Sequence, residues 1–196
     1  FIMGGTGSLV KALERLMSDV GIEIIKNFDV SEIVCDPAAT RVSGIKASDG
    51  ELLDFDSIVF NGDPADAYKN LLKGAKSYPK LRKPESLTQY SMGLFVLFFG
   101  TKRTYPNIAH HTIWLGERHK ELLADIFDRK ILADDFSLYL HRPTATDKTF
   151  APEGCDSFYA LCPVPNLQSG TNWETEGVKL RNRIVKALDE SILPDL

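Results

Sequence analysis

The stretch SMGLFVLFFG, residues Ser91 to Gly100, decides how the second half of this chain folds. Its centre, Leu94 to Phe99, is an unbroken apolar run that ends at a glycine. A run this short cannot cross a bilayer as a helix, which needs about 20 residues. We interpret it as a strand buried on both faces, because both alternating sets of its side chains are apolar.

The composition of the 196 residues restricts the possible partners. The formal net charge of -4, without a basic stripe, argues against nucleic acid. The three cysteines, Cys35, Cys155 and Cys162, lack CxxC spacing and predict reduced, cytosolic thiols rather than disulfides or a zinc site. No signal peptide or membrane-spanning segment is recognisable. The chain starts at Phe1 and enters a glycine-rich turn at once, so we expect it to be a piece of a longer protein.

The first 63 residues predict a helix followed by a small meander. The glycine turn Gly4 to Gly7 leads into apolar residues at helical spacing that end at Gly21. GGTGS does not fit the GxGxxG dinucleotide pattern, so we favour a tight backbone turn over a phosphate site. Asp49-Gly50 predicts a hairpin. The expected strands are Val30 to Cys35, Arg41 to Ala47, Glu51 to Asp54 and a further buried strand, Ser57 to Phe60.

The remaining residues predict an α+β arrangement in which helices cover a large apolar sheet. The basic stretch Gly74 to Pro84 is broken by prolines, and we interpret it as a solvated connection rather than a contact with an anionic membrane. Helices are expected from Pro64 to Lys73, from Glu117 to Arg129 and from about Thr175 to Pro194. Further strands are expected at Ile108 to Leu115, Phe136 to His141 and Ser157 to Cys162.

No catalytic or metal-binding motif is defined by spacing alone. His110 and His111 are adjacent in an extended segment, where neighbouring side chains point to opposite faces, so we expect that they do not share an ion. His119 and His141 lack HxxxH or HExxH spacing. The sequence therefore predicts no metal site, and it contains no defensible nucleophile elbow or paired-carboxylate motif.

Several stretches resemble bacterial-type phytoene desaturases, which are flavoproteins of the amine-oxidase-like group. They are GGTGSLV (Gly4 to Val10), LFVLFFG (Leu94 to Gly100), AHHTIWLGERHKELL (Ala109 to Leu123), DDFSLYLHRPTATDKTFAPEGC (Asp134 to Cys155) and PVPNL (Pro163 to Leu167). The resemblance runs in order through essentially the whole chain.

This resemblance implies a fold, a cofactor and a reaction. Residues 1–63 look like the middle piece of a discontinuous, Rossmann-like FAD-binding domain, and residues 64–196 like an incomplete substrate domain. The implied activity is that of an FAD-dependent oxidoreductase, which introduces double bonds into an apolar C40 carotenoid precursor by hydride transfer to FAD. The family's two glycine-rich flavin motifs are missing from this sequence, so we expect the isolated chain to be inactive and not to retain FAD.

The resemblance also implies site residues and surroundings. A basic position that is thought to act on the substrate corresponds to Lys120, with Arg118 two residues earlier. Val30 corresponds to a position that contacts the adenine end of FAD through its backbone. A phytoene-like polyene and a membrane surface are the implied partners, and the implied location is cytoplasmic with peripheral membrane association. Three alternatives stay open: a carotenoid isomerase, a desaturase for a shorter polyene, and a non-enzymatic module that binds apolar ligands or membranes.

Overall fold

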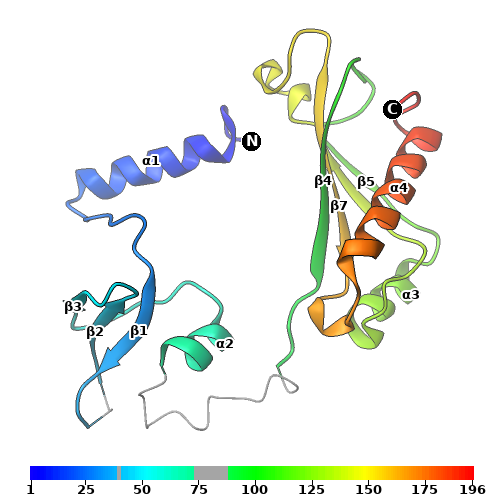
Figure 1. The fold of residues 1–196 in the computed structure, drawn as a ribbon. Helices are drawn as coiled ribbons and strands as arrows, with labels where there is room; N and C mark the ends of the chain where they lie inside the picture. Colours follow the sequence, from blue (N-terminus) through cyan, green and yellow to red (C-terminus); the bar gives the residue numbers. More distant parts are fainter. Residues whose placement is uncertain (39–40, 73–87) are drawn as a thin grey trace. The chain divides into compact units, whose positions relative to one another are not determined.

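The computed structural model describes residues 1–38, 41–72 and 88–196, which form two compact units (Figure 1). One unit comprises Lys11–Gln89, and the other comprises Phe1–Val10 together with Tyr90–Leu196. Each contains an antiparallel sheet, which confirms the mixed α and β class expected from the sequence. The assignment of residues 1–63 and 64–196 to an FAD domain and a substrate domain stays a prediction.

Helix α1 (Gly5–Asp19) confirms the helix predicted after the glycine turn. The chain leaves it through Gly21, whose φ of +79° lies in the left-handed region that glycine tolerates best. None of the helix residues is buried, and the apolar side chains Leu13 and Leu16 are about half exposed. The amphipathic pattern therefore correctly predicts the helix, although its apolar face is left open.

A three-stranded meander forms the smaller sheet, in the order β1-β2-β3. The Asp49-Gly50 hairpin is confirmed, because Gly50 has a φ of +98° and its amide donates to the carbonyl of Ala47 at 3.0 Å. The meander is followed by a short α2 that continues as a π-helical turn, and Asp63 caps it by accepting from the Ala65 amide. The bounds are β1 Val30–Cys35, β2 Val42–Ala47, β3 Leu52–Asp54, α2 Pro64–Asp66 and the turn Ala67–Leu71.

The buried strand predicted at Ser57 to Phe60 is wrong. These residues are irregular, and Val59 is 94% exposed. An apolar run predicts burial only where a neighbouring strand and a core accept it, and the three-stranded sheet ends at β3 on this side. The basic stretch from Gly74 to Pro84 lies outside the described residues.

The larger sheet has four antiparallel strands in the order β4-β7-β6-β5. The stretch Ser91 to Gly100 forms β4, which pairs with β7 along its whole length, from Gly93 opposite Val164 to Thr101 opposite Asp156. The bounds are β4 Gly93–Thr101, β5 His111–Trp114, β6 Leu138–His141 and β7 Asp156–Val164.

Only one face of this sheet is covered within its unit. Helix α4 (Trp173–Ser191) packs on it through Leu180, Ile184 and Leu188, which join the inward side chains of β6 and β7 in one buried cluster (Figure 1). Phe95 of β4 stacks on Trp173 with ring centroids 6.2 Å apart. From the sequence we expect helices such as the one at Glu117 to Arg129 to cover one face of β4. In the described part of the chain the side chains of α4 enter this buried cluster, and none from residues 117–129 does.

The remaining segments are short. The helix predicted at Glu117 to Arg129 is present, but it begins at His119: α3 (His119–Ala124) continues as a π-helical turn, Asp125–Arg129. Single 3-10 turns occur at Pro143–Ala145, Lys148–Phe150 and Leu167–Ser169. None of the helices in the described part of the chain combines the length and the apolar character needed to cross a membrane.

Candidate functional site

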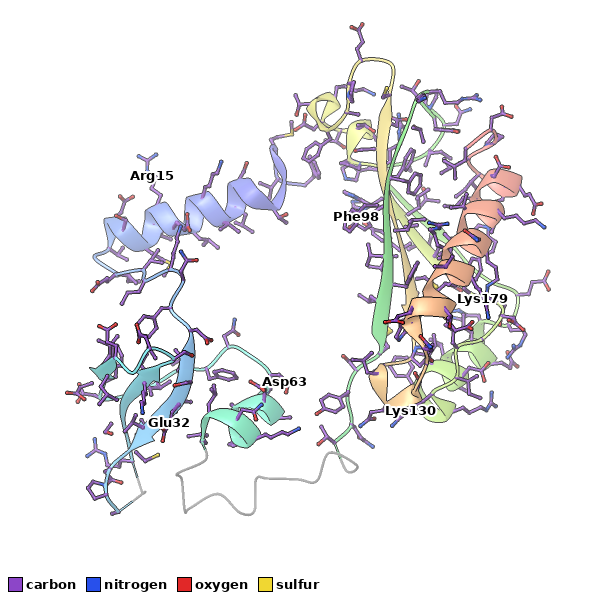
Figure 2. All side chains as sticks on the ribbon, in the orientation of Figure 1. Arg15, Glu32, Asp63, Phe98, Lys130 and Lys179 are labelled. Carbon is purple, nitrogen blue, oxygen red and sulfur yellow. The ribbon has the colours of Figure 1, made fainter. Side chains whose placement is uncertain are left out.

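The sheet face opposite α4 is apolar and is not covered by the described residues of its own unit. Leu94, Val96 and Phe98 of β4 lie on it with 49%, 37% and 75% of their surface exposed. Figure 2 shows Phe98 projecting from β4 to the side away from α4. The prediction that β4 is buried on both faces is therefore wrong for this face, which we call the open face. A strand is buried on both faces only when other elements pack on both faces of its sheet, and among the described residues of this unit no element packs on the open face.

The register of the four strands places aromatic and apolar side chains in rows across the open face. In the first row Phe98, Tyr159, His141 and His111 are successive partners on β4, β7, β6 and β5. Their neighbouring ring centroids are 5.6, 4.6 and 5.4 Å apart, which is contact distance for aromatic rings. A second row of the same kind consists of Val96, Leu161, Tyr139 and Ile113.

These rows make the open face long as well as apolar. A strand of nine residues such as β4 extends about 30 Å. Beside the Gly93 end of β4 lies an apolar pocket of about 390 Å³, which is lined by Leu94 of the open face and by Phe95 and Trp173 of the covered face. An exposed, contiguous apolar surface of this kind marks a binding site more often than a free surface.

A cluster of polar rings ends the first row. His110 and His141 share a hydrogen bond between their Nε2 atoms at 2.8 Å, and His111 Nδ1 lies 2.6 Å from the hydroxyl of Tyr139. Burial lowers the pKa of both His110 and His141, and the nearby histidines lower it further. Burial, together with the hydrogen bond to Tyr159, raises the pKa of Tyr139 to about 12. Burial therefore favours the neutral forms of His110, His141 and Tyr139.

The argument that His110 and His111 must face apart is wrong. His110 precedes β5, whose first residue is His111, so the alternation of a regular strand does not apply between them. Their ring centroids are 4.4 Å apart. His141 joins them because it is the direct cross-strand partner of His111. The sequence does contain a signal, because Tyr139 and His141 alternate with apolar residues, but only the pairing of β5 with β6 shows what they contact.

Arg118 and Lys120 lie at the start of α3 in different surroundings. Arg118 binds Asp125 at 2.9 Å and Asp135 at 3.1 Å. The Asp125 carboxylate is almost completely buried and also accepts from Arg129, and these two guanidinium groups hold its pKa below the ordinary value. Lys120 is exposed, and no ion pair joins it to any other residue of the described ranges. Of the two cations, only Lys120 has no carboxylate partner among the described residues.

Val30 is the first residue of β1 and belongs to the other unit. It is half buried and pairs with Ala47 of β2. The strand β1 is an edge strand, and its register with β2 shifts immediately after Val30. Backbone groups on the outer side of an edge strand have no partner in the sheet, so this position suits a ligand that is recognised through the main chain.

Comparison with known proteins identifies relatives along the whole chain, although no family model matches it. A phytoene desaturase (lycopene-forming) from Pseudescherichia vulneris is 44% identical over 197 residues, which cover 100% of this chain and 40% of that protein. This chain is related to bacterial phytoene desaturases. The resemblance noted in the sequence is thereby confirmed.

Other phytoene desaturases with different named products align with the same residues. A neurosporene-forming enzyme from Rhodobacter capsulatus is 38% identical, over 99% of this chain and 38% of its own length. A zeta-carotene-forming enzyme from Myxococcus xanthus is 34% identical, over 100% of this chain and 37% of its own length. The chain thus spans about two fifths of these phytoene desaturases.

Proposed function

We propose that this chain is part of an FAD-dependent carotenoid desaturase, and that the open face binds the polyene substrate. The observation that carries the proposal is the exposed apolar surface of Leu94, Val96 and Phe98 on a sheet whose other face packs against α4 in a buried cluster. The names of the relatives support a phytoene-like substrate. The whole reaction belongs to a longer protein than the residues described above.

The chemistry of such a substrate fits this surface. A hydrocarbon polyene offers no hydrogen-bond donors or acceptors, so its binding depends on the removal of apolar surface from water, about 25 cal/mol per Å². The polar groups in the rows are the rings of His111, His141, Tyr139 and Tyr159, and His111 bonds to Tyr139 while His141 bonds to His110. They therefore add little desolvation cost when an apolar ligand covers them.

FAD would supply the redox step, since flavins accept hydride, and the protein would orient the substrate. We propose that the outer backbone edge of β1 at Val30 contacts the adenine end. Lys120 is proposed as the cation that acts on the substrate, because its charge is not engaged by a described carboxylate. Arg118, which is bound to two aspartates, is proposed to position the start of α3.

Peripheral contact with a membrane is part of the proposal. Phytoene-like hydrocarbons dissolve in the bilayer, so the open face would have to receive its ligand from there. A non-enzymatic module would instead bind polyene or vesicles without converting anything, and an isomerase would change double-bond geometry without adding double bonds. Product analysis distinguishes these alternatives.

The decisive experiment uses the full-length gene in phytoene-accumulating cells, with carotenoids separated by chromatography. Val96→Glu places a charge on the open face, whereas Val185→Glu places the same charge on the exposed side of α4 at nearly equal exposure, 37% against 36%. We expect the unmodified gene and V185E to give coloured desaturated products, and V96E to lose at least tenfold in product at equal protein level. Unchanged phytoene with the unmodified gene would contradict the activity, and equal products from both variants would contradict the role of the open face.

A further inference from the structure

Three of the chain's four histidines meet at one corner of the larger sheet. His110 precedes β5, His111 begins it, and His141 is the last residue of β6 and the direct partner of His111. One ring nitrogen from each lies within 4.8 Å of the others. We propose that His110, His111 and His141 bind a divalent transition-metal cation of the zinc class.

The outer nitrogens of two of these rings already have the partners that metal-bound histidines need. His110 Nδ1 lies 2.5 Å from Thr146 Oγ1, and His111 Nδ1 lies 2.6 Å from the hydroxyl of Tyr139. A ligating histidine typically gives its second ring N–H to such an acceptor, which fixes the ring and leaves the other nitrogen for the metal. With Nδ1 of His110 and of His111 engaged in this way, the Nε2 atom of each ring is the one that can bind a cation.

The third ring supplies an independent observation. His141 Nδ1 is buried and has no hydrogen-bond partner in the described part of the chain. The His141 ring packs against the Tyr159 ring, with centroids 4.6 Å apart. A buried polar atom without a partner is rare in a finished structure. His141 Nε2 shares a hydrogen bond with His110 Nε2, which requires a proton on one of the two nitrogens. A cation would replace that proton, and His141 can bind it through Nε2 or through the unpartnered Nδ1.

The ligand set selects the chemical class of the cation. Three imidazoles without a thiolate or carboxylate suit zinc, copper, nickel and cobalt better than calcium or magnesium. Three protein ligands also leave a fourth tetrahedral position for water or a small ligand. The site lies at the end of the first row of the open face, but the inference does not depend on the function proposed above.

The test uses the purified chain without a histidine tag and with its amino terminus acetylated. Co²⁺ is added stepwise, and the visible d–d absorption of the bound ion is measured. Acetylation is needed because the Phe1 ring lies against His110, with ring centroids 4.6 Å apart, so the amino group of the isolated chain would compete as a ligand. We expect one equivalent of Co²⁺ to bind and Zn²⁺ to displace it, since zinc binds such sites more tightly. His111→Gln and His141→Gln should each weaken binding by at least tenfold, and Thr146→Val, which removes a hydrogen-bond acceptor, by about tenfold.

His119→Gln is the matched control, because His119 is the remaining histidine and lies on α3 outside the cluster. We expect it to bind Co²⁺ as the unmodified chain does. If a cluster variant fails to fold, imidazole nitrogen resonances of the unmodified chain decide the question, since Zn²⁺ should shift three rings and leave His119 unchanged. Absence of both the d–d bands and the resonance shifts in the unmodified chain, or equal weakening by H119Q and H111Q, would overturn the proposal and leave only a packed group of rings.

Discussion

Arg142 Nε donates to Asp156 Oδ2 at 2.9 Å, and both side chains are almost fully shielded from solvent, 4% and 1% exposed. The carboxylate also accepts from the Thr144 hydroxyl at 2.6 Å and from the Tyr105 amide at 2.7 Å. Arg142 Nη1 in turn donates to the carbonyl of Ile108 at 2.7 Å. This network joins the start of β7 to the segments that precede β5 and follow β6, so it fixes the corner where the histidine cluster lies.

Asp156→Asn should strongly destabilise the larger unit. The substitution leaves the Arg142 guanidinium buried without a counter-charge, and breaking a buried pair in this way costs about 3–5 kcal/mol of unfolding free energy. Urea unfolding followed by tryptophan fluorescence measures this effect, because Trp114 and Trp173 both belong to this unit.

Asp195→Asn is the matched control for that substitution. Asp195 binds Arg103 at 2.9 Å, but its side chain is 85% exposed, so the loss should stay below about 1 kcal/mol. Its φ of +61° is also one that asparagine tolerates. Equal losses for D156N and D195N would show that the buried network contributes no more than an exposed ion pair.

The same carboxylate predicts how the stability of the unit depends on pH. Burial alone would raise the pKa of Asp156, but the hydrogen bonds from Thr144, Tyr105 and Arg142 outweigh it and lower the pKa below its ordinary value. The unfolded chain therefore binds the proton more tightly, so the stabilisation is complete above the unfolded pKa and is lost as the pH falls through the folded one.

Urea titrations between about pH 7 and about pH 3 should show this loss beginning below about pH 5. Asp156→Asn should flatten the profile without abolishing it, because Asp125 and Asp147 also have lowered pKa values. A profile that is as steep in D156N as in the unmodified chain would assign the acid sensitivity to other carboxylates.

The sequence predicts the elements of this chain well because their signals are local. Alternation, helical spacing and the Asp49-Gly50 turn depend on neighbouring residues, and the strands and helices they predict are present, whereas the strand predicted from the short apolar run Ser57 to Phe60 is not. Whether a face is covered depends instead on residues far away in sequence. Six apolar residues in β4 therefore correctly predict a strand, but they do not reveal that Leu94, Val96 and Phe98 stay exposed while Phe95 packs on Trp173.

The candidate site was harder to predict for the same reason. His111 and His141 are 30 positions apart, and only the register between β5 and β6 makes them neighbours. The different surroundings of Arg118 and Lys120 likewise depend on Asp125 and Asp135, which approach Arg118 after the chain turns through α3. Spacing rules that assume one regular element do not find either arrangement.

Two glycines of the larger unit should respond in opposite directions to alanine. A Cβ at Gly116 would lie 2.5 Å from the carbonyl oxygen of Phe136, so Gly116→Ala forces the backbone apart and should cost about 1–3 kcal/mol. A Cβ at Gly177 would meet only Phe95, at an ordinary 3.7 Å, and it lies within α4. Gly177→Ala should therefore stabilise the unit by up to about 1 kcal/mol. Urea midpoints measure both, and a change of the same sign in the two variants would contradict the packing described here.

Arg118→Ala and Lys120→Ala should separate a positioning role from a role on the substrate. Arg118→Ala removes one of the two cations that hold the buried Asp125 carboxylate, so it should lower the urea midpoint of the larger unit. Lys120→Ala removes an exposed side chain that has no ion pair among the described residues, so the midpoint should not change.

In the full-length enzyme we expect Lys120→Ala to reduce the activity per folded molecule more than Arg118→Ala does. Lys120→Ala should lower the rate of product formation at least about tenfold, within the range that a positioned proton-transfer or charged group supplies, with stability unaffected. Lys120→Arg keeps the charge and serves as the control, which should recover part of the rate if charge rather than a transferable proton is needed. Arg118→Ala should lower the amount of folded enzyme more than its rate. The opposite result is that Lys120→Ala desaturates as fast as the unmodified enzyme, whereas Arg118→Ala, at an equal amount of folded protein, does not. In that case Arg118 is the cation that acts on the substrate, and its ion pairs with Asp125 and Asp135 orient it.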